Sequence, residues 1–317
     1  MKDKVTIVYV LTSDGKGWYE EMLMLSVHSL RQHNPKVEVM LLTDDSTLRM
    51  LTDKKSPLLE VMTPHVADIP VEYNRMQTSR YLKMNLREIV CGDYLFMDVD
   101  TIVCNPLDEI IATKADMAMV PDCHGKTHMD VISQRCKQVG FDSPIGLPYF
   151  NSGVQFVRDT TETRRFCEAW RQNWQQSVSR GVPFDQPALC QTNGKMGYFV
   201  QPLPDYWNCM IPIYEGLLHA LSPQARVIHY FNENKSSVRS FVYSQIRRKG
   251  GIKGWLRLLT RYPRTVGVTF FAMGDMELIK QALRHNPFSK DGVGGLRYLQ
   301  FLLMLVVSKI LYLSNKA

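Results

Sequence analysis

The sequence lacks the features that mark disordered, fibrous and polytopic membrane proteins. It has no internal repeat and no low-complexity tract, and charged residues make up only 22% of its 317 positions. Hydrophobic residues account for 45% and aromatic residues for 10%, which are ordinary globular proportions. A chain of this length can form one large α/β domain with an appendage, or two small domains, with core enough for an enzyme.

Cysteine is scarce, and its spacing indicates neither a disulfide framework nor a zinc finger. The seven cysteines contain no CxxC pair, and no apolar targeting segment precedes the first predicted strand. An odd number of thiols without a targeting segment favours a reducing compartment. We therefore expect a cytoplasmic protein.

Acidic residues are almost missing from the C-terminal part of the chain. From Ser236 to the end, fourteen Lys and Arg residues accompany only three acids, whereas residues 1–235 carry a net charge of −4 within the total of +7. A basic region of this kind indicates an anionic partner surface, either a nucleic acid or the cytoplasmic face of a membrane.

The composition of this basic region favours the membrane and argues against a nucleic-acid partner. Residues 239–264 hold eight basic and no acidic residues, interleaved with aromatic residues and Leu, as in helices that lie in a bilayer interface. Residues 296–313 are nearly apolar, but their longest unbroken apolar run, 301–307, is shorter than the about 20 residues that span a bilayer.

We predict that residues 236–317 form a basic, helical extension that associates with the inner face of the cell membrane as a peripheral anchor. An amphipathic or half-inserted anchor is favoured over a transmembrane helix. The remaining alternative is that these C-terminal residues form a core helix that packs on the preceding domain.

The pattern of apolar residues predicts an α/β fold with a doubly wound sheet. A strand at residues 5–11, a helix at 19–33 and a strand at 37–42 form a βαβ unit, and hence a parallel pair. Ligands of such a sheet gather at the carboxyl ends of its strands. The remaining predicted elements are a helix at 75–90, strands at 93–97, 117–120 and 149–157, a helix at 161–178, and two strands that close the sheet at 194–200 and 226–230. Residues 122–148 are predicted to be a loop over the site with one short helix.

The segment most informative about chemistry follows the predicted strand at residues 93–97. Asp98 and Asp100 stand two residues apart, with Val99 between them. Two ionised carboxylates held this close repel each other, and ionised groups near a core are costly. A divalent cation relieves both problems, and oxygen ligands suit Mg²⁺ or Mn²⁺, which commonly bridge a protein to a diphosphate. A loop that carries two acids by chance is the alternative.

Five further segments resemble, in the same order, motifs of the family 8 glycosyltransferases, nucleotide-sugar transferases of the GT-A fold. These segments are Arg80, Tyr149-Phe150-Asn151-Ser152-Gly153-Val154, Asp185-Gln186, Leu203-Pro204 with Trp207-Asn208, and His229 with Lys235. The resemblance covers most of residues 5–235. It implies a Rossmann-like, doubly wound mixed sheet in a nucleotide-sugar-binding catalytic domain at residues 1–235. The sequence departs from the family pattern after His229, where no Gly follows, and after Lys235, where no Pro-Trp follows.

The resemblance also implies a role for each matching residue. His229 would join Asp98 and Asp100 as a third ligand of Mn²⁺ or Mg²⁺, and Arg80 and Lys235 would neutralise the diphosphate of the donor. Asn151, Asp185 and Gln186 would hold the donor sugar, with Gln186 nearest the anomeric carbon. Thr12, Asp14 and Asp44 stand at strand ends, where the nucleoside is contacted; with Arg80, Asp98, Val99, Asp100 and Lys235 they make up the predicted donor-binding set.

Several of these residues have a plainer structural interpretation. Asp185 would cap the helix that Pro187 begins, and Asn151 would form a turn with Gly153. His229 would be a hydrogen-bonded core histidine. Arg80 and Lys235, each taken alone, would be solvated surface cations.

The sequence thus predicts a metal-dependent glycosyltransferase of polysaccharide biosynthesis. It would move a hexose from a nucleotide sugar, with a UDP-sugar favoured, to a lipid-linked or surface-glycan acceptor, and the resemblance implies retention of configuration. One alternative is a haloacid dehalogenase-type phosphatase with Asp98 as nucleophile, although Ile102 stands where such enzymes carry Thr or Val. The other is a non-catalytic GT-A-like domain that binds a membrane-associated partner.

Overall fold

The computed structural model describes residues 5–16, 19–70, 73–122, 126–210, 216, 219–220, 222–230 and 303, with the backbone alone at 126–128. Lys235 and the predicted C-terminal extension, apart from Leu303, lie outside the described residues. Internal contacts divide the chain into two units. The first consists of Met1–Glu20, Lys36–Val99 and Asp108–Pro204, and the second of Glu21–Pro35, Asp100–Leu107 and Asp205–Ala317.

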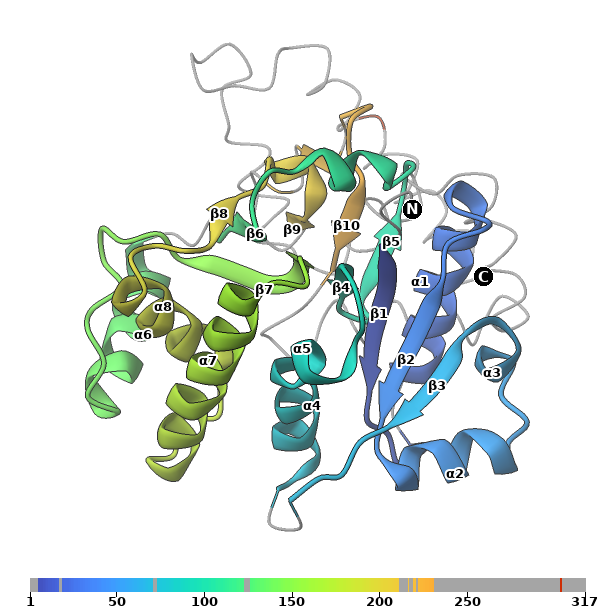
Figure 1. Cartoon of the computed structure of the whole chain (residues 1–317), viewed down its shortest axis with the longest axis horizontal. Coiled ribbons are helices and arrows are strands. Elements are labelled where there is room, and N and C mark those ends of the chain that lie inside the picture. The colour runs from blue at the N-terminus through green and yellow to red at the C-terminus, as the bar shows by residue number, and fades with distance from the viewer. Residues whose placement is uncertain are drawn as a thin grey trace. The chain divides into compact units, whose positions relative to one another are not determined.

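A mixed sheet of seven strands forms the centre of the first unit (Figure 1). Its order is β3-β2-β1-β4-β7-β6-β8, and β7 alone runs antiparallel to its neighbours. The chain moves outward from β1 to β2 and β3 and then returns to place β4 on the other side of β1. The strands are β1 Thr6–Leu11, β2 Val39–Thr43, β3 Thr63–Val66, β4 Tyr94–Met97, β6 Met117–Pro121, β7 Phe150–Val157 and β8 Gln201–Pro202.

The central strands are apolar along their whole length because both faces of the sheet are covered. Every residue of β1, β4 and β7 is buried, whereas every residue of the edge strand β3 is exposed. The pairing brings Ile7 opposite Leu95 and Met97 opposite Val154. The sheet is therefore a rigid base for the polar residues at its ends.

Helices of the first unit pack their apolar sides on one face of this sheet. Leu82, Phe166 and Trp170 belong to one buried cluster with Val8 and Phe96 of the strands. The helix around Phe166 begins with a capping box, in which the Thr160 and Thr163 side chains and backbone amides pair reciprocally. The helices are α2 Asp45–Asp53, α3 Leu58–Val61, α4 Arg75–Met84, α5 Leu86–Ile89, α6 Lys126–Gln138, α7 Thr161–Ser179 and α8 Asp185–Lys195, with a 3₁₀ turn η1 at Asp108–Ala112.

The second unit contains a separate three-stranded sheet of order β5-β10-β9. β10 Val227–His229 pairs antiparallel with β5 Thr101–Val103 and parallel with β9 Cys209–Met210, which follows the 3₁₀ turn η2 at Asp205–Trp207. Helix α1, Tyr19–His33, belongs to this unit from Glu21 on. Its Ser29 hydroxyl accepts a 2.9 Å hydrogen bond from the Val103 amide, which ties the helix to β5.

Three predicted elements differ from the structure. The helix predicted at 75–90 is broken at Asn85, whose side-chain amide donates to the Tyr81 carbonyl at 2.7 Å and ends α4. Residues 194–200 are not a strand, because α8 continues to Lys195 and because Gly197 and Tyr198 both have positive φ angles, outside the region of extended chain. The strand near 226–230 exists as β10, but it joins the second sheet and does not close the main one.

The segment at 122–148 also contains more helix than predicted, since α6 has 13 residues. Among the residues that the structure describes, no helix combines the length and the apolar character needed to cross a membrane.

Candidate active site

Polar residues gather at one edge of the first unit's sheet, where its parallel strands end and the antiparallel strand begins. β1 runs into Thr12, β4 into Asp98 and β6 into Asp122, while Asn151 is the second residue of β7. Because β7 is antiparallel to β4 and β6, its first residues lie at the same edge as their last ones. This is the edge at which open α/β sheets bind their ligands, beside the point where the strand order reverses between β1 and β4.

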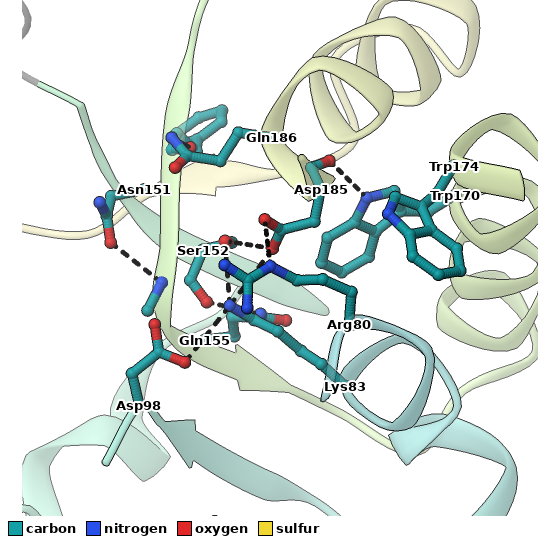
Figure 2. A network of polar contacts seen from close by, with 12 residues as sticks. Arg80, Lys83, Asp98, Asn151, Ser152, Gln155, Trp170, Trp174, Asp185 and Gln186 are labelled. Carbon is teal, nitrogen blue, oxygen red and sulfur yellow. Dashed lines mark hydrogen bonds and ion pairs between the residues drawn. The ribbon is translucent and has the colours of Figure 1, made fainter. Parts of the chain in front are cut away.

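A buried ionic network occupies the centre of this edge (Figure 2). Asp185 lies at the start of α8, and each of its two carboxylate oxygens contacts a cation: Oδ1 lies 3.2 Å from Arg80 Nε and Oδ2 lies 3.3 Å from Lys83 Nζ. Both cations project from α4, three residues apart and hence on the same face of the helix. The Ser152 hydroxyl of β7 donates to Asp185 Oδ2 at 2.7 Å.

These contacts keep Asp185 ionised although it is buried. Burial of the carboxyl would by itself raise the pKa of Asp185, but the Lys83 ammonium and the Arg80 guanidinium, with the Ser152 hydroxyl, hold it well below its ordinary value. The alternative interpretation, in which Asp185 caps a helix that Pro187 begins, is wrong. The helix begins at Asp185 itself, its N-cap is Phe184, and no side chain caps it.

Trp170 of α7 fixes the backbone at this point. Its indole N–H donates to the Asp185 carbonyl at 3.0 Å, and the neighbouring Trp174 donates to the Pro183 carbonyl at 3.1 Å. Two buried aromatic rings therefore hold the turn that leads into α8, so that the Asp185 side chain is presented from a rigid backbone.

Asp122 connects the two predicted sugar-binding amides. Gln186 Nε2 donates to Asp122 Oδ2 at 2.7 Å, and Asn151 Nδ2 lies 3.4 Å from the same oxygen. The Asn151 side-chain oxygen accepts a 2.9 Å hydrogen bond from the Gly153 amide, so the turn predicted for Asn151 and Gly153 is present. Asn151, Asp185 and Gln186 therefore lie together at one site, as the prediction of a common sugar site requires.

In the second unit, Asp100 and His229 form a buried pair. His229 Nε2 lies 3.4 Å from Asp100 Oδ1, and His229 Nδ1 lies 3.0 Å from Asn208 Oδ1. Because an amide oxygen only accepts hydrogen bonds, this contact places the proton of a neutral imidazole on Nδ1 and the lone pair on Nε2, toward Asp100.

This donor set fits a divalent metal. A nitrogen lone pair and a carboxylate oxygen that face each other repel, and a divalent cation between them would be bound by both. The amide behind the imidazole fixes its tautomer, as partners behind metal-bound histidines commonly do. Asp98, which follows β4 in the first unit, precedes Asp100 by two residues in the sequence and could offer a further carboxylate oxygen.

The residues predicted to contact the nucleoside have well-defined local roles. The Thr12 hydroxyl donates to the Arg75 carbonyl at 3.2 Å, and Asp14 forms an ion pair with Arg75 at 2.8 Å. The hydrogen bond from the Lys16 amide and the Arg75 side chain lower the pKa of Asp14. Asp44 is the N-cap of α2, where it accepts from the Thr47 amide. Val99 is buried between the two aspartates, and contacts of these residues with a nucleotide stay a prediction.

Sequence reasoning missed three residues of this site. Lys83 stands three positions after Arg80 on a predicted helix, and that spacing alone indicates a shared face. Asp122 follows a predicted strand, as Asp98 does. Asn208 was noted only as part of a motif, although a polar residue after Trp207 in a buried segment indicates a hydrogen-bond partner.

Solved structures with a similar fold are glycosyltransferases. The apo form of glycosyltransferase GlyE from Streptococcus pneumoniae TIGR4 has 18% identity and a TM-score of 0.51, over 82% of this chain and 64% of that one. Mouse xyloside xylosyltransferase 1 has 12% identity and a TM-score of 0.50, over 73% and 98%. The bifunctional glycosyltransferase WbbM has 14% identity and a TM-score of 0.50, over 74% of this chain but only 47% of WbbM. These likenesses define the fold as GT-A.

The sequence model of glycosyl transferase family 8 matches residues 11–236, and the chain therefore belongs to that family. A search of curated protein sequences gave no match. The predicted fold and enzyme class are confirmed: the chain is a glycosyltransferase. Family membership replaces the alternative of a haloacid dehalogenase-type phosphatase with Asp98 as nucleophile.

Proposed function

We propose that this protein is a metal-dependent hexosyltransferase that takes its sugar from a UDP-hexose and transfers it with retention to a lipid-linked or surface-glycan acceptor. The observation that carries the metal dependence is the Asp100–His229 pair, 3.4 Å apart, with the imidazole oriented by Asn208. The UDP-hexose is the donor class implied by the family resemblance.

Asp98, Asp100 and His229 would hold Mn²⁺ or Mg²⁺. When bound, such an ion supplies positive charge to the diphosphate as the nucleotide departs. Arg80 would add a further cation for the donor, and Lys235, outside the described residues, is proposed to do the same.

The sugar of the donor would be held at the edge formed by Asn151, Asp185 and Gln186. The ionised Asp185 would accept hydrogen bonds from sugar hydroxyls. The side-chain amide of Gln186, which donates a hydrogen bond to Asp122, would offer a polar group near the reacting carbon. Since Lys83, Arg80 and the Ser152 hydroxyl all contact the Asp185 carboxylate, it keeps one orientation when the sugar arrives.

The acceptor has a candidate entrance next to Asp122. A cleft of about 410 Å³ is lined by Asp122, Asp130, Met129, Pro121, Tyr149 and the turn at 144–148. This volume lies within the range of small-molecule sites, and mixed apolar and acidic walls suit the faces and hydroxyls of a sugar ring. We propose that this cleft receives the acceptor, because Asp122 connects it to Gln186.

The cellular place of the reaction is proposed from the sequence. The basic residues between 239 and 264, interleaved with Trp and Leu, support binding to an anionic lipid surface on the cytoplasmic side of the membrane. Sedimentation of the full chain with vesicles that contain anionic lipid, compared with neutral vesicles, tests this proposal. Equal sedimentation with both kinds, or with neither, would contradict it.

The donor class is tested by thermal unfolding of the full chain with UDP, GDP, CMP or UDP-sugars, each with Mn²⁺ or with EDTA. A ligand that binds only the folded state raises the unfolding midpoint by mass action. We expect UDP and a UDP-hexose to raise it only with Mn²⁺, and Asp100→Ala to abolish the increase. A stabilisation by GDP or CMP alone would reassign the donor. Stabilisation without any sugar transfer would favour the non-catalytic binding domain.

A further inference from the structure

Lys83 is a buried lysine at the centre of the site, and its ammonium group contacts three oxygen atoms. Its side chain is 5% exposed, and Nζ lies 3.0 Å from Ser152 Oγ, 3.3 Å from Asp185 Oδ2 and 3.5 Å from Asp98 Oδ1. The Lys83 ammonium also lies over the Phe96 ring, 4.9 Å from its centroid, as in a cation–π contact. A lysine is seldom buried unless it is paired, because desolvation of an ammonium is costly.

Lys83 is the group that contacts carboxylates with two different expected roles. Asp98 belongs to the proposed metal ligands and Asp185 to the proposed sugar site, and the Lys83 ammonium lies within 3.5 Å of both carboxylates. Ser152 extends the link, because its hydroxyl accepts from Lys83 and donates to Asp185. Figure 2 shows this chain of contacts running from Asp98 across Lys83 and Ser152 to Asp185.

We propose that Lys83 is a positioning residue that couples the metal-binding end of the donor site to its sugar-binding end. This proposal rests on the proposed function. Lys83 orients the Asp185 carboxylate for the sugar, and its positive charge beside Asp98 opposes a second cation on the same carboxylate. The site therefore binds metal well only when the diphosphate arrives to share the positive charge.

In the full chain, Lys83→Met should weaken recognition of the sugar and, at the same time, strengthen binding of the metal. The preference for UDP-glucose or UDP-galactose over UDP should fall about tenfold, ~1.4 kcal/mol, because Asp185 loses its ion pair with the buried ammonium and with it a fixed orientation. The Mn²⁺ concentration that gives half of the UDP-dependent stabilisation should fall, because no ammonium competes beside Asp98. A residue with a packing role alone would weaken UDP and UDP-sugar binding in parallel and leave the metal requirement unchanged.

Arg87→Met is the matched control. Arg87 is also a fully buried cation on the next helix, α5, and it lies over Tyr94 of the same strand, 5.0 Å from the ring centroid. Its ion pair is with Asp159 at 3.4 Å and not with the site. Arg87→Met should lower stability while keeping the wild-type sugar preference and metal requirement.

Lys83→Arg restores the charge and should return the metal requirement to the wild-type value. Where Lys83→Met does not fold, Lys83→Gln, which keeps a donor but removes the charge, makes the same test. The proposal for Lys83 alone is overturned if UDP and Mn²⁺ stabilise the wild-type chain and the Lys83 variant is stabilised identically or needs more Mn²⁺. A wild-type chain that no UDP compound stabilises overturns the proposed function, and the proposal for Lys83 with it.

Discussion

Replacement of Asp185 by Asn tests the buried ionic network directly. The carboxylate is 7% exposed and contacts Lys83 at 3.3 Å and Arg80 at 3.2 Å, so Asp185→Asn leaves the buried Lys83 ammonium with only the more distant carboxylate of Asp98, at 3.5 Å. Loss of one partner of a buried ion pair costs about 3–5 kcal/mol. Because Arg80 is one-third exposed and can turn toward water, we expect the lower end, about 3 kcal/mol at pH 7. The midpoint of thermal unfolding should then fall by roughly 6–12 °C.

The pH dependence of this loss follows from the lowered pKa of Asp185. A carboxyl with a lowered folded-state pKa contributes stability fully above the pKa of an unfolded aspartate, about 3.9, and loses it as the pH falls further. The difference in free energy of unfolding between the wild type and Asp185→Asn should be largest at pH 7 and should narrow at pH 3. Urea unfolding at both pH values measures it, with Asp53→Asn, at an exposed position at the end of α2, as control. A difference of the same size at both pH values would refute the reasoning.

Three further predictions concern the metal site, the cleft and the thiols. Asn208→Ala should weaken Mn²⁺ binding about 10–100-fold, because the His229 ring loses the partner that orients it. The control Asn105→Ala, which loses hydrogen bonds to the Pro223 and Ala225 carbonyls, should leave Mn²⁺ binding unchanged. Titration of Mn²⁺ at saturating UDP measures both variants, and equal effects would contradict the role of Asn208. Ile145→Asp at the cleft should raise the acceptor KM without changing donor KM, whereas Val131→Asp, exposed on α6 but not among the cleft residues, should change neither. In the described part of the chain Cys91 is exposed, whereas burial raises the pKa of Cys167 and Cys190 to about 12. Cys91→Ser should therefore remove a thiol that reacts fast with a thiol reagent at pH 8. An unchanged reaction rate would argue against the structure.

Elements with a strong local pattern could be predicted from the sequence. The buried strands β1, β4 and β7 have nearly continuous apolar sequences, and α7 has a capped, amphipathic one, so their predicted bounds agree with the structure to within one or two residues. The order of the motifs also led to the correct family, since each motif reports a strand end or a helix start at a fixed place in the fold.

Pairings between distant segments could not be predicted in this way. β10 looks like any short apolar strand, and only its partner β5, more than 120 residues earlier, decides that it belongs to a second sheet. Residues 194–200, predicted as a strand, instead contain the last residues of α8 and the left-handed Gly197 and Tyr198 that follow it. The burial of Lys83 could not be predicted for a similar reason. A lone lysine on a helix normally lies in solvent, and the burial of Lys83 depends on Asp185, about a hundred residues later in the sequence.

We propose that the chain transfers a sugar from a UDP-hexose with the help of Asp98, Asp100, His229 and a divalent metal. The most direct test measures UDP released from UDP-glucose and UDP-galactose by the full chain, with Mn²⁺ or with EDTA, beside Asp100→Ala. We expect release by the wild type with Mn²⁺ only, and at least about a hundredfold less by Asp100→Ala, the size of effect that loss of one charge-stabilising group has on turnover. UDP release that persists in EDTA, or that Asp100→Ala leaves unchanged, would contradict it.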